Sequence, residues 1–175
     1  MLSRVVEALD RPAKRAPHPA GPEAREAAVA AVLHGLEPTD LTLLFIRRAT
    51  VAGDPWSGDV AFPGGRREAA DGSLLETAIR ETREELGLDL SVARYLGSLD
   101  DVGPVSRRRP MVVQPHVFYL RELPALSPNR EVAGVHRLSL DKLLANEGRG
   151  PMPFEWNGQS TVSYTHLTLP TILRV

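Results

Sequence analysis

The sequence has no cysteine, so it cannot build the disulfide framework of a small secreted protein. Its first residues lack the apolar core and cleavage site of a secretory signal, and no uninterrupted apolar run approaches the length of a membrane span. The formal net charge is −1, which gives no sign of the broad basic surface that non-specific binding of nucleic acid or membrane requires. These absences predict a soluble, cytoplasmic protein that binds a small molecule, with neither nucleic acid nor a membrane as its partner.

Lysine is also scarce, since only Lys14 and Lys142 occur among the 21 basic residues. An excess of arginine can reflect selection for the phosphate-matching guanidinium group, but a GC-rich coding sequence is the more common cause. The bias alone therefore assigns no phosphate site.

The 175 residues suit one compact domain with a buried core. Residues 1–25 are expected to form a short helix, at 2–9, and an extended arm in which RPAKRAPHPAGP places four prolines and a glycine within twelve residues. The folded domain is expected at residues 26–162. The last thirteen residues, 163–175, resemble translated sequencing-adapter sequence, so we expect the native chain to diverge after about Val162.

Hydrophobic patterning predicts a domain of the mixed α/β (α+β) class. The segment AAVAAVLHGL, which follows Glu26, is ambiguous between helix and strand, whereas residues 41–49, LTLLFIRRA, are typical of a buried strand. Residues 38–40 are expected to form the turn between them, and residues 63–65 to stop a short strand at 59–62. Further strands are predicted at 92–99, 112–120, 132–138 and, as an edge strand, 152–156, and helices at 74–86 and 139–145.

The predicted helix at 74–86 has signals at both ends. Ser73 and Glu76 form an S-x-x-E capping box, in which each side chain accepts from the backbone N–H of the other residue. Gly87 follows the last periodic position and is the expected left-handed stop. The helical period separates a mainly apolar arc from a polar one. The apolar arc contains Leu75, Ala78, Ile79, Thr82 and Leu86, and the polar arc Thr77, Glu81, Glu84 and Glu85.

Glu81, Glu84 and Glu85 are unusual because they crowd the last turn of this helix. Their i, i+3 and i+4 spacing costs about 0.2 to 0.5 kcal/mol per pair in repulsion, and the negative helix end opposes each charge by about 0.3 to 1 kcal/mol. A hard divalent cation would convert this repulsion into coordination, and Mg²⁺, followed by Mn²⁺, suits such carboxylates. A solvated acidic face is the alternative. The adjacent FPGG turn allows close approach of a ligand or metal and favours the metal site.

The segment GGRREAADGSLLETAIRETREELGL resembles the Nudix box, which reads G-x5-E-x7-R-E-U-x-E-E-x-G-U with U apolar. The second half matches from Arg80 to Leu88, with Thr82 at an apolar position. The first half departs from the general box, because the spacing from Gly65 to Arg80 is one residue longer and Gly72 replaces the early glutamate.

This departure resembles the coenzyme A pyrophosphatase-like branch of the Nudix family, whose box contains F-P-G-G-x-x-D/E-x-x-D and later T-A-x-R-E. The upstream LLFIRR strand also resembles that branch, so the similarity spans roughly residues 28–160. Residues 54–57, Asp-Pro-Trp-Ser, do not match, since the branch carries an arginine and a histidine shortly before the glycine. The matching positions are Phe62, Pro63, Gly64, Gly65, Glu68, Asp71, Thr77, Ala78, Arg80 and Glu81.

The resemblance implies the Nudix α/β/α sandwich, with a mixed central sheet between helices. It also implies that Glu81 and Glu85 are the principal ligands of Mg²⁺ or Mn²⁺, with Glu84 as a further ligand or water-positioning group and the carbonyl of Gly65 as another ligand. Arg80 would orient the glutamates by ion pairing and completes the expected catalytic set. The metal would neutralise pyrophosphate oxygens and acidify a water, whose proton a carboxylate would take during attack on phosphorus. Which glutamate acts as the base stays open.

Three arginines are candidate substrate-binding residues. Arg66 and Arg67 directly follow the diglycine and could clamp phosphate oxygens, although exposed arginines are often only solvated. Arg48, at the end of the LLFIRR strand, is the third. Weaker candidates, each with a purely structural alternative, are Arg107, Arg108 and Arg109 for a ribose phosphate, Trp56 for base stacking and Glu131 as an extra metal ligand. His34, His116 and His136 are expected to be structural.

These residues predict hydrolysis of a nucleoside diphosphate-linked substrate, foremost coenzyme A or a derivative, to 4′-phosphopantetheine and adenosine 3′,5′-bisphosphate. One alternative is the same chemistry on ADP-ribose, a dinucleotide or an oxidised nucleotide. Another is a non-catalytic Nudix-fold sensor that binds a nucleotide. The intact set of glutamates favours an enzyme over a sensor.

Overall fold

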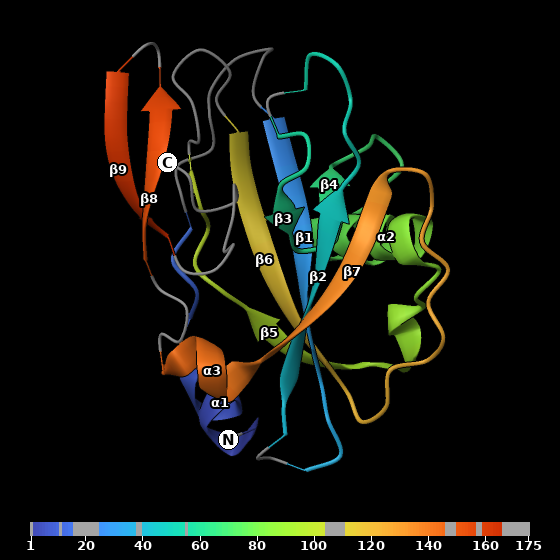
Figure 1. Ribbon diagram of the computed structural model, residues 1–175. Helices are drawn as coiled ribbons and strands as arrows, with labels where there is room; N and C mark the ends of the chain where they lie inside the picture. Colours follow the sequence, from blue (N-terminus) through green and yellow to red (C-terminus); the bar gives the residue numbers. More distant parts are fainter. Residues whose placement is uncertain are drawn as a thin grey trace.

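A computed structural model of the protein describes residues 2–10, 12–15, 25–37, 40–54, 56–103, 111–145, 150–156 and 159–165. Its main feature is a mixed seven-stranded sheet (Figure 1). The strands of this sheet are β1 (Arg25–His34), β2 (Thr42–Arg48), β3 (Val60–Ala61), β4 (Gly64–Arg66), β5 (Arg94–Ser98), β6 (Met111–Leu120) and β7 (Val132–Ser139). The helices are α1 (Leu2–Leu9), α2 (Leu74–Leu86) and α3 (Leu140–Leu144), with a 3-10 turn at Leu90–Val92. Strands β8 (Gly150–Trp156) and β9 (Gln159–Thr165) form a separate antiparallel pair.

Strand β1 is the centre of the sheet. It runs parallel to β6 from the pair Arg25 and Met111 to the pair His34 and Leu120, and antiparallel to β2 and β4. The order β3-β2-β1-β6-β5 is completed by β4 beside β1 and β7 beside β2. Residues 27–33 of β1 are all buried, because both faces of this central strand are covered. The segment whose sequence was ambiguous between helix and strand is therefore a strand.

Alternate residues of β1 pack against different helices, so the fold has three layers. Ala28, Ala30 and Val32 belong to the core that contains Ala78 and Leu86 of α2. Ala31 and Leu33 point to the other face, where Val5 and Leu9 of α1 and Leu140 of α3 cover them. The α/β/α sandwich implied by the sequence resemblance is confirmed, and α2 lies against one face of the sheet (Figure 1).

Most predicted elements occur within two residues of their expected bounds, including the helix at 74–86. The FPGG segment, residues 62–65, which we call the diglycine turn, differs from the prediction. Strand β3 ends before it, at Ala61, but its two glycines, Gly64 and Gly65, start β4 and pair with Val29 and Ala28 of β1. Strand β9 was not predicted, and it continues to Thr165, past the boundary expected near Val162. The place where the native chain diverges stays a prediction. The turn expected at 38–40 lies mostly outside the described residues.

Among the described residues, no helix combines the length and the apolar character needed to cross a membrane.

Candidate active site

Helix α2 begins and ends at the predicted residues. The hydroxyl of Ser73 accepts from the backbone N–H of Glu76 at 3.2 Å, and Gly87 adopts the left-handed conformation with φ of 66°. The capping box is only half formed, because the carboxylate of Glu76 accepts from the backbone N–H of Gly72 at 2.8 Å and not from that of Ser73. Both ends of the helix are thus fixed by local interactions, which sets the direction of its carboxylates.

The apolar arc of α2 packs as expected, and the structure shows how a polar residue, Thr82, is accommodated in it. Ala78, Thr82 and Leu86 are fully buried, and the hydroxyl of Thr82 donates to the carbonyl of Ala78 at 2.7 Å, which satisfies the buried polar group. The polar arc differs from expectation, since Thr77 is fully buried and Glu85 is only 4% exposed. A helical period cannot distinguish a solvated polar face from one that a neighbouring turn covers.

The diglycine turn covers Glu85. The backbone N–H of Gly64 donates to Oε2 of Glu85 at 2.9 Å. Burial raises the pKa of Glu85 to about 7, although the hydrogen bond from Gly64 opposes the shift; the nearby charges of Glu81 and Glu131 raise it further. Gly64 has no room for a side chain, because an added Cβ would overlap the carbonyl oxygen of Ala28 on β1. Close packing of the turn on β1 is therefore what encloses Glu85.

Gly65 touches the second key glutamate. An added Cβ at Gly65 would lie 2.5 Å from Oε1 of Glu81, so this position has to be glycine if Glu81 keeps its conformation. Burial raises the pKa of Glu81 as well, against the hydrogen bond and charge of Arg80. The turn thus holds Glu81 and Glu85 in partly dry surroundings, where the charge of Glu81 disfavours ionisation of Glu85.

Arg80 connects the helix to the loop before it. Its Nε donates to Oδ1 of Asp71 and its Nη2 to Oδ2, both at 2.9 Å. Nη1 reaches Glu81 at 3.0 Å and Glu84 at 3.3 Å. The predicted ion pair with Glu84 is present, but Asp71 is the main partner. This pairing holds the pKa of Asp71 well below its usual range and raises that of Arg80.

Asp71 is the residue whose role the sequence did not reveal. It is 7% exposed and also accepts from the hydroxyl of Thr77 and the backbone N–H of Glu68, both at 2.9 Å. Asp71 and Thr77 both stand at positions that match the coenzyme A pyrophosphatase-like box. That match was the available signal, although it gave no indication that the two side chains meet.

The donor chemistry of this cluster fits a hard divalent cation. Glu81 and Glu85 offer carboxylate oxygens beside the backbone of Gly65, and their pKa values are raised first by burial and then by neighbouring carboxylates, a combination that a cation would offset. Within the described ranges, no three acidic, histidine or cysteine side chains are arranged to hold a metal ion. Glu84 is the outlying member, since its side chain is 57% exposed and points to Arg80.

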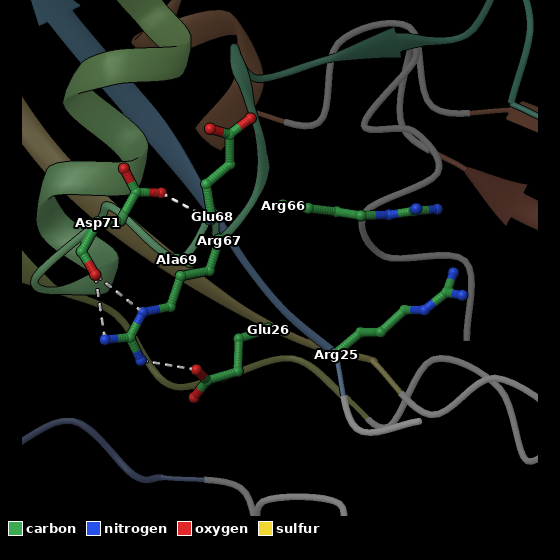
Figure 2. Close-up of a pocket in the computed structure, with 7 residues that line it drawn as sticks. All are labelled: Arg25, Glu26, Arg66, Arg67, Glu68, Ala69 and Asp71. Atoms are coloured by element: carbon green, nitrogen blue, oxygen red, sulfur yellow. Dashed lines mark hydrogen bonds and ion pairs between the residues drawn. The ribbon is translucent and has the colours of Figure 1, made fainter. Parts of the chain in front are cut away.

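The three candidate substrate-binding arginines have different surroundings. Arg48 forms an ion pair with Asp54 at 2.9 Å, and its charge lowers the pKa of Glu85, so it lies close to the carboxylates. Arg67 donates to Glu26 at 2.8 Å and to the carbonyl of Asp71, which leaves it engaged within the protein. The side chain of Arg66 extends from β4 (Figure 2), and its charge helps to lower the pKa of Asp54, while its backbone carbonyl accepts from Arg80 at 3.0 Å.

The weaker candidates are scattered. Glu131 is exposed but near enough to Glu85 to raise its pKa. The backbone N–H of Trp56 donates to Asp54, as in a loop anchor. His34 contacts Thr42, and His116 is buried beside the hydroxyl of Tyr95, so both have the expected structural surroundings. His136 is exposed on β7, and Arg107, Arg108 and Arg109 lie outside the described residues.

Comparison with known proteins gives matches in sequence and in structure. The NUDIX domain family matches residues 24–154. The chain is 35% identical over 132 residues to the mitochondrial coenzyme A diphosphatase NUDT8 of Mus musculus, covering 75% of this chain and 60% of that protein. It is 36% identical over 105 residues to the uncharacterized Nudix hydrolase NudL of Yersinia pestis (strain Pestoides F), covering 59% and 51%. The chain therefore spans about half to three fifths of the length of these two relatives.

A solved structure of a Nudix hydrolase has the same fold as this chain. The crystal structure of the Nudix hydrolase RenU from M. smegmatis superposes with a TM-score of 0.56 at 19% identity, covering 69% of this chain and 73% of that one. The family match includes β1, the diglycine turn and the whole of α2, which are the elements that carry the glutamate cluster. The box in the sequence, the sandwich in the structure and the family match over residues 24–154 together show that this chain belongs to the Nudix family.

Proposed function

We propose that this protein is a metal-dependent pyrophosphohydrolase that cleaves the diphosphate of a nucleoside diphosphate derivative, foremost coenzyme A or one of its derivatives. The observation that carries the proposal is the packing of Glu85 and Glu81 against Gly64 and Gly65. It brings two carboxylates of raised pKa to the place where the start of β4 packs against α2. Such paired, perturbed carboxylates are typical of a catalytic site.

Each residue of the cluster has a role in this proposal. Glu81 and Glu85, with the carbonyl of Gly65, would hold Mg²⁺ or Mn²⁺, and Glu84 would complete the site through water or on binding of substrate. A bound divalent cation neutralises diphosphate oxygens and lowers the pKa of a bound water. Arg80 holds Glu81 in place while Asp71 fixes Arg80. This positioning limits the reorganisation needed when substrate binds.

The reaction would be hydrolysis of a phosphoanhydride. One carboxylate of the cluster accepts a proton from water as the water oxygen bonds to phosphorus, and the bridging P–O bond breaks. Its electrons and a proton stay with the departing phosphate. For coenzyme A the products would be 4′-phosphopantetheine and adenosine 3′,5′-bisphosphate. Similarity to a mitochondrial coenzyme A diphosphatase at 35% identity supports this substrate over the alternatives.

The test is product analysis by phosphorus NMR with Mg²⁺ and a panel of coenzyme A, ADP-ribose, a dinucleotide and an oxidised nucleotide. We expect the highest kcat/KM for coenzyme A. Glu81→Gln and Glu85→Gln should each lower kcat by at least about 100-fold. Glu76→Gln is the matched control, because it removes a charge from the other end of the same helix and keeps an oxygen to accept from Gly72.

Two outcomes would change the proposal. Faster cleavage of ADP-ribose or a dinucleotide would keep the chemistry and replace the substrate. Tight nucleotide binding with no new phosphorus signal for any substrate would favour the sensor alternative and reject the enzyme.

A further inference from the structure

Two arginines, Arg25 of β1 and Arg66 of β4, lie at the same end of the sheet and on the same face. Arg66 is directly opposite Ala27 in the antiparallel pair of β1 and β4. Directly opposed residues point to the same face, and so do residues two apart on a strand, so Arg25, Ala27 and Arg66 share a face. Figure 2 shows the two arginine side chains extending in the same direction. We call Arg25 and Arg66 the arginine pair.

The arginine pair borders a pocket of about 450 Å³ that Glu26, Arg67, Glu68, Ala69 and Asp71 also line. Ala27 lies between the two arginines and is small, so it leaves their guanidinium groups room to approach one ligand. Arg66 directly follows Gly65, the residue in contact with Glu81, so the pocket adjoins the candidate active site. The two arginine side chains lie on the sheet face opposite α2, because Gly65 points to α2 and the neighbouring side chain points away, whereas Asp71 and Arg67 line the pocket from the side of α2.

Two acidic side chains of the pocket are engaged with other arginines, and Asp54, on which the charge of Arg66 acts, is itself paired with Arg48. Glu26 is paired with Arg67 at 2.8 Å, and Asp71 is paired with Arg80 at 2.9 Å. Glu68 points away from the arginine pair in Figure 2. The guanidinium groups of Arg25 and Arg66 form no hydrogen bond or ion pair within the described part of the chain, although the backbone carbonyl of Arg66 accepts from Nη2 of Arg80 at 3.0 Å. Two unpaired guanidinium groups on one small pocket are a suitable site for a doubly charged anion.

We propose that the arginine pair binds a phosphate monoester of the substrate, separate from the diphosphate that is cleaved. This rests on the proposed function, because it assumes a nucleotide substrate, and it narrows the substrate to nucleotides with an additional phosphate on the ribose. Each guanidinium can donate two parallel hydrogen bonds to such a phosphate. The glutamate cluster then acts on the diphosphate at the other side of Gly65.

The test compares two nucleotides by titration calorimetry in metal-free buffer: adenosine 3′,5′-bisphosphate, which carries the extra phosphate, and adenosine 5′-monophosphate, which lacks it. The native protein should bind the bisphosphate at least about tenfold more tightly. Arg25→Ala should remove most of this preference and leave the affinity for the monophosphate within about twofold. Arg66→Ala should weaken the bisphosphate to a similar extent, and Arg25→Lys should keep part of the preference.

Arg121→Ala is the matched control. It removes the same charge from an exposed position just after β6, at the opposite end of the sheet from Arg25. Thermal melting of each variant checks folding, and Arg25→Gln replaces Arg25→Ala if the latter melts early. Equal affinity of the native protein for the two nucleotides, or equal loss of both in the variants, would overturn the proposal.

Measurements of turnover distinguish a failure of the proposed phosphate site from a failure of the proposed enzymatic function. If the preference for the bisphosphate depends on Arg25 but no coenzyme A is cleaved, the phosphate site stands and the enzyme assignment fails. If coenzyme A is cleaved and Arg25→Ala leaves the ratio of kcat/KM for coenzyme A over dephospho-coenzyme A unchanged, the enzyme assignment stands and the phosphate site fails.

Discussion

The carboxylate of Asp71 accepts two parallel hydrogen bonds from the guanidinium of Arg80, at 2.9 Å from Nε and 2.9 Å from Nη2. Asp71 precedes α2 and Arg80 lies in its second turn, so the pair ties the loop to the helix that carries the glutamates. The side chain of Asp71 is 5% exposed and that of Arg80 is 22% exposed. This bidentate, largely buried pair is more favourable than the surface ion pair that spacing along the helix suggested.

Asp71→Asn is expected to destabilise the protein by about 2 to 4 kcal/mol, because it leaves the charge of Arg80 without its main partner. Because Arg80 holds the pKa of Asp71 below its ordinary value of 3.8, this stabilisation is complete above about pH 4 and decreases as pH falls. Urea unfolding at pH 7 measures the effect. Asp10→Asn, at an exposed position, is the control and should change stability by less than about 0.5 kcal/mol. A loss below about 1 kcal/mol in Asp71→Asn would contradict the assignment.

Alanine at the two glycines of the turn should have different consequences. Gly65→Ala meets the end of the flexible Glu81 side chain, which can move, so the fold should survive while kcat/KM falls on the order of 100-fold. Gly64→Ala meets the backbone of Ala28 and Val29, which cannot move cheaply, so stability should fall by about 2 kcal/mol or more. Turnover and thermal melting of both variants test the contrast. The same loss of stability in both would show that Gly65 is only a packing position.

The buried Glu85 should make the metal-free protein less stable as pH rises. Its pKa is about 7 in the folded protein and 4.5 in the unfolded one, so the folded state binds more protons between these values. The native protein should therefore lose up to about 3 kcal/mol of stability between pH 4.5 and pH 7 relative to Glu85→Gln, which cannot ionise. Urea unfolding with a chelator present, at steps of pH, gives this difference. Parallel pH profiles for the two proteins would rule out a raised pKa at Glu85.

Metal binding should stabilise the fold through the same carboxylates. Mg²⁺ at 100 times its Kd would add about 3 kcal/mol to the free energy of unfolding, since only the folded protein assembles the site. Glu81→Gln and Glu85→Gln should lose most of this gain, and Glu76→Gln should keep it. Thermal melting with and without Mg²⁺ measures the shift, and removal of the metal by a chelator should also abolish turnover. An unchanged shift in Glu81→Gln would place the cation elsewhere.

The sequence alone determined the features that depend on neighbours in the chain. The capping serine, the stop at Gly87 and the helical period fixed α2 to the residue, because each acts within one or two turns of backbone. The spacing of Arg80, Glu81, Glu84 and Glu85 identified the box for the same reason.

Only the tertiary structure decided what those residues touch. The burial of Glu85 depends on a backbone N–H that lies 21 positions earlier, and the arginine pair depends on the register between β1 and β4. The tertiary structure also decided that residues 27–33 form a strand. Burial on both faces of the sheet removes the alternation of apolar and polar residues by which a strand is usually recognised in a sequence. Local preferences amount to fractions of a kcal/mol, whereas burial of a carboxylate costs several, so the tertiary contacts set the chemistry of the site.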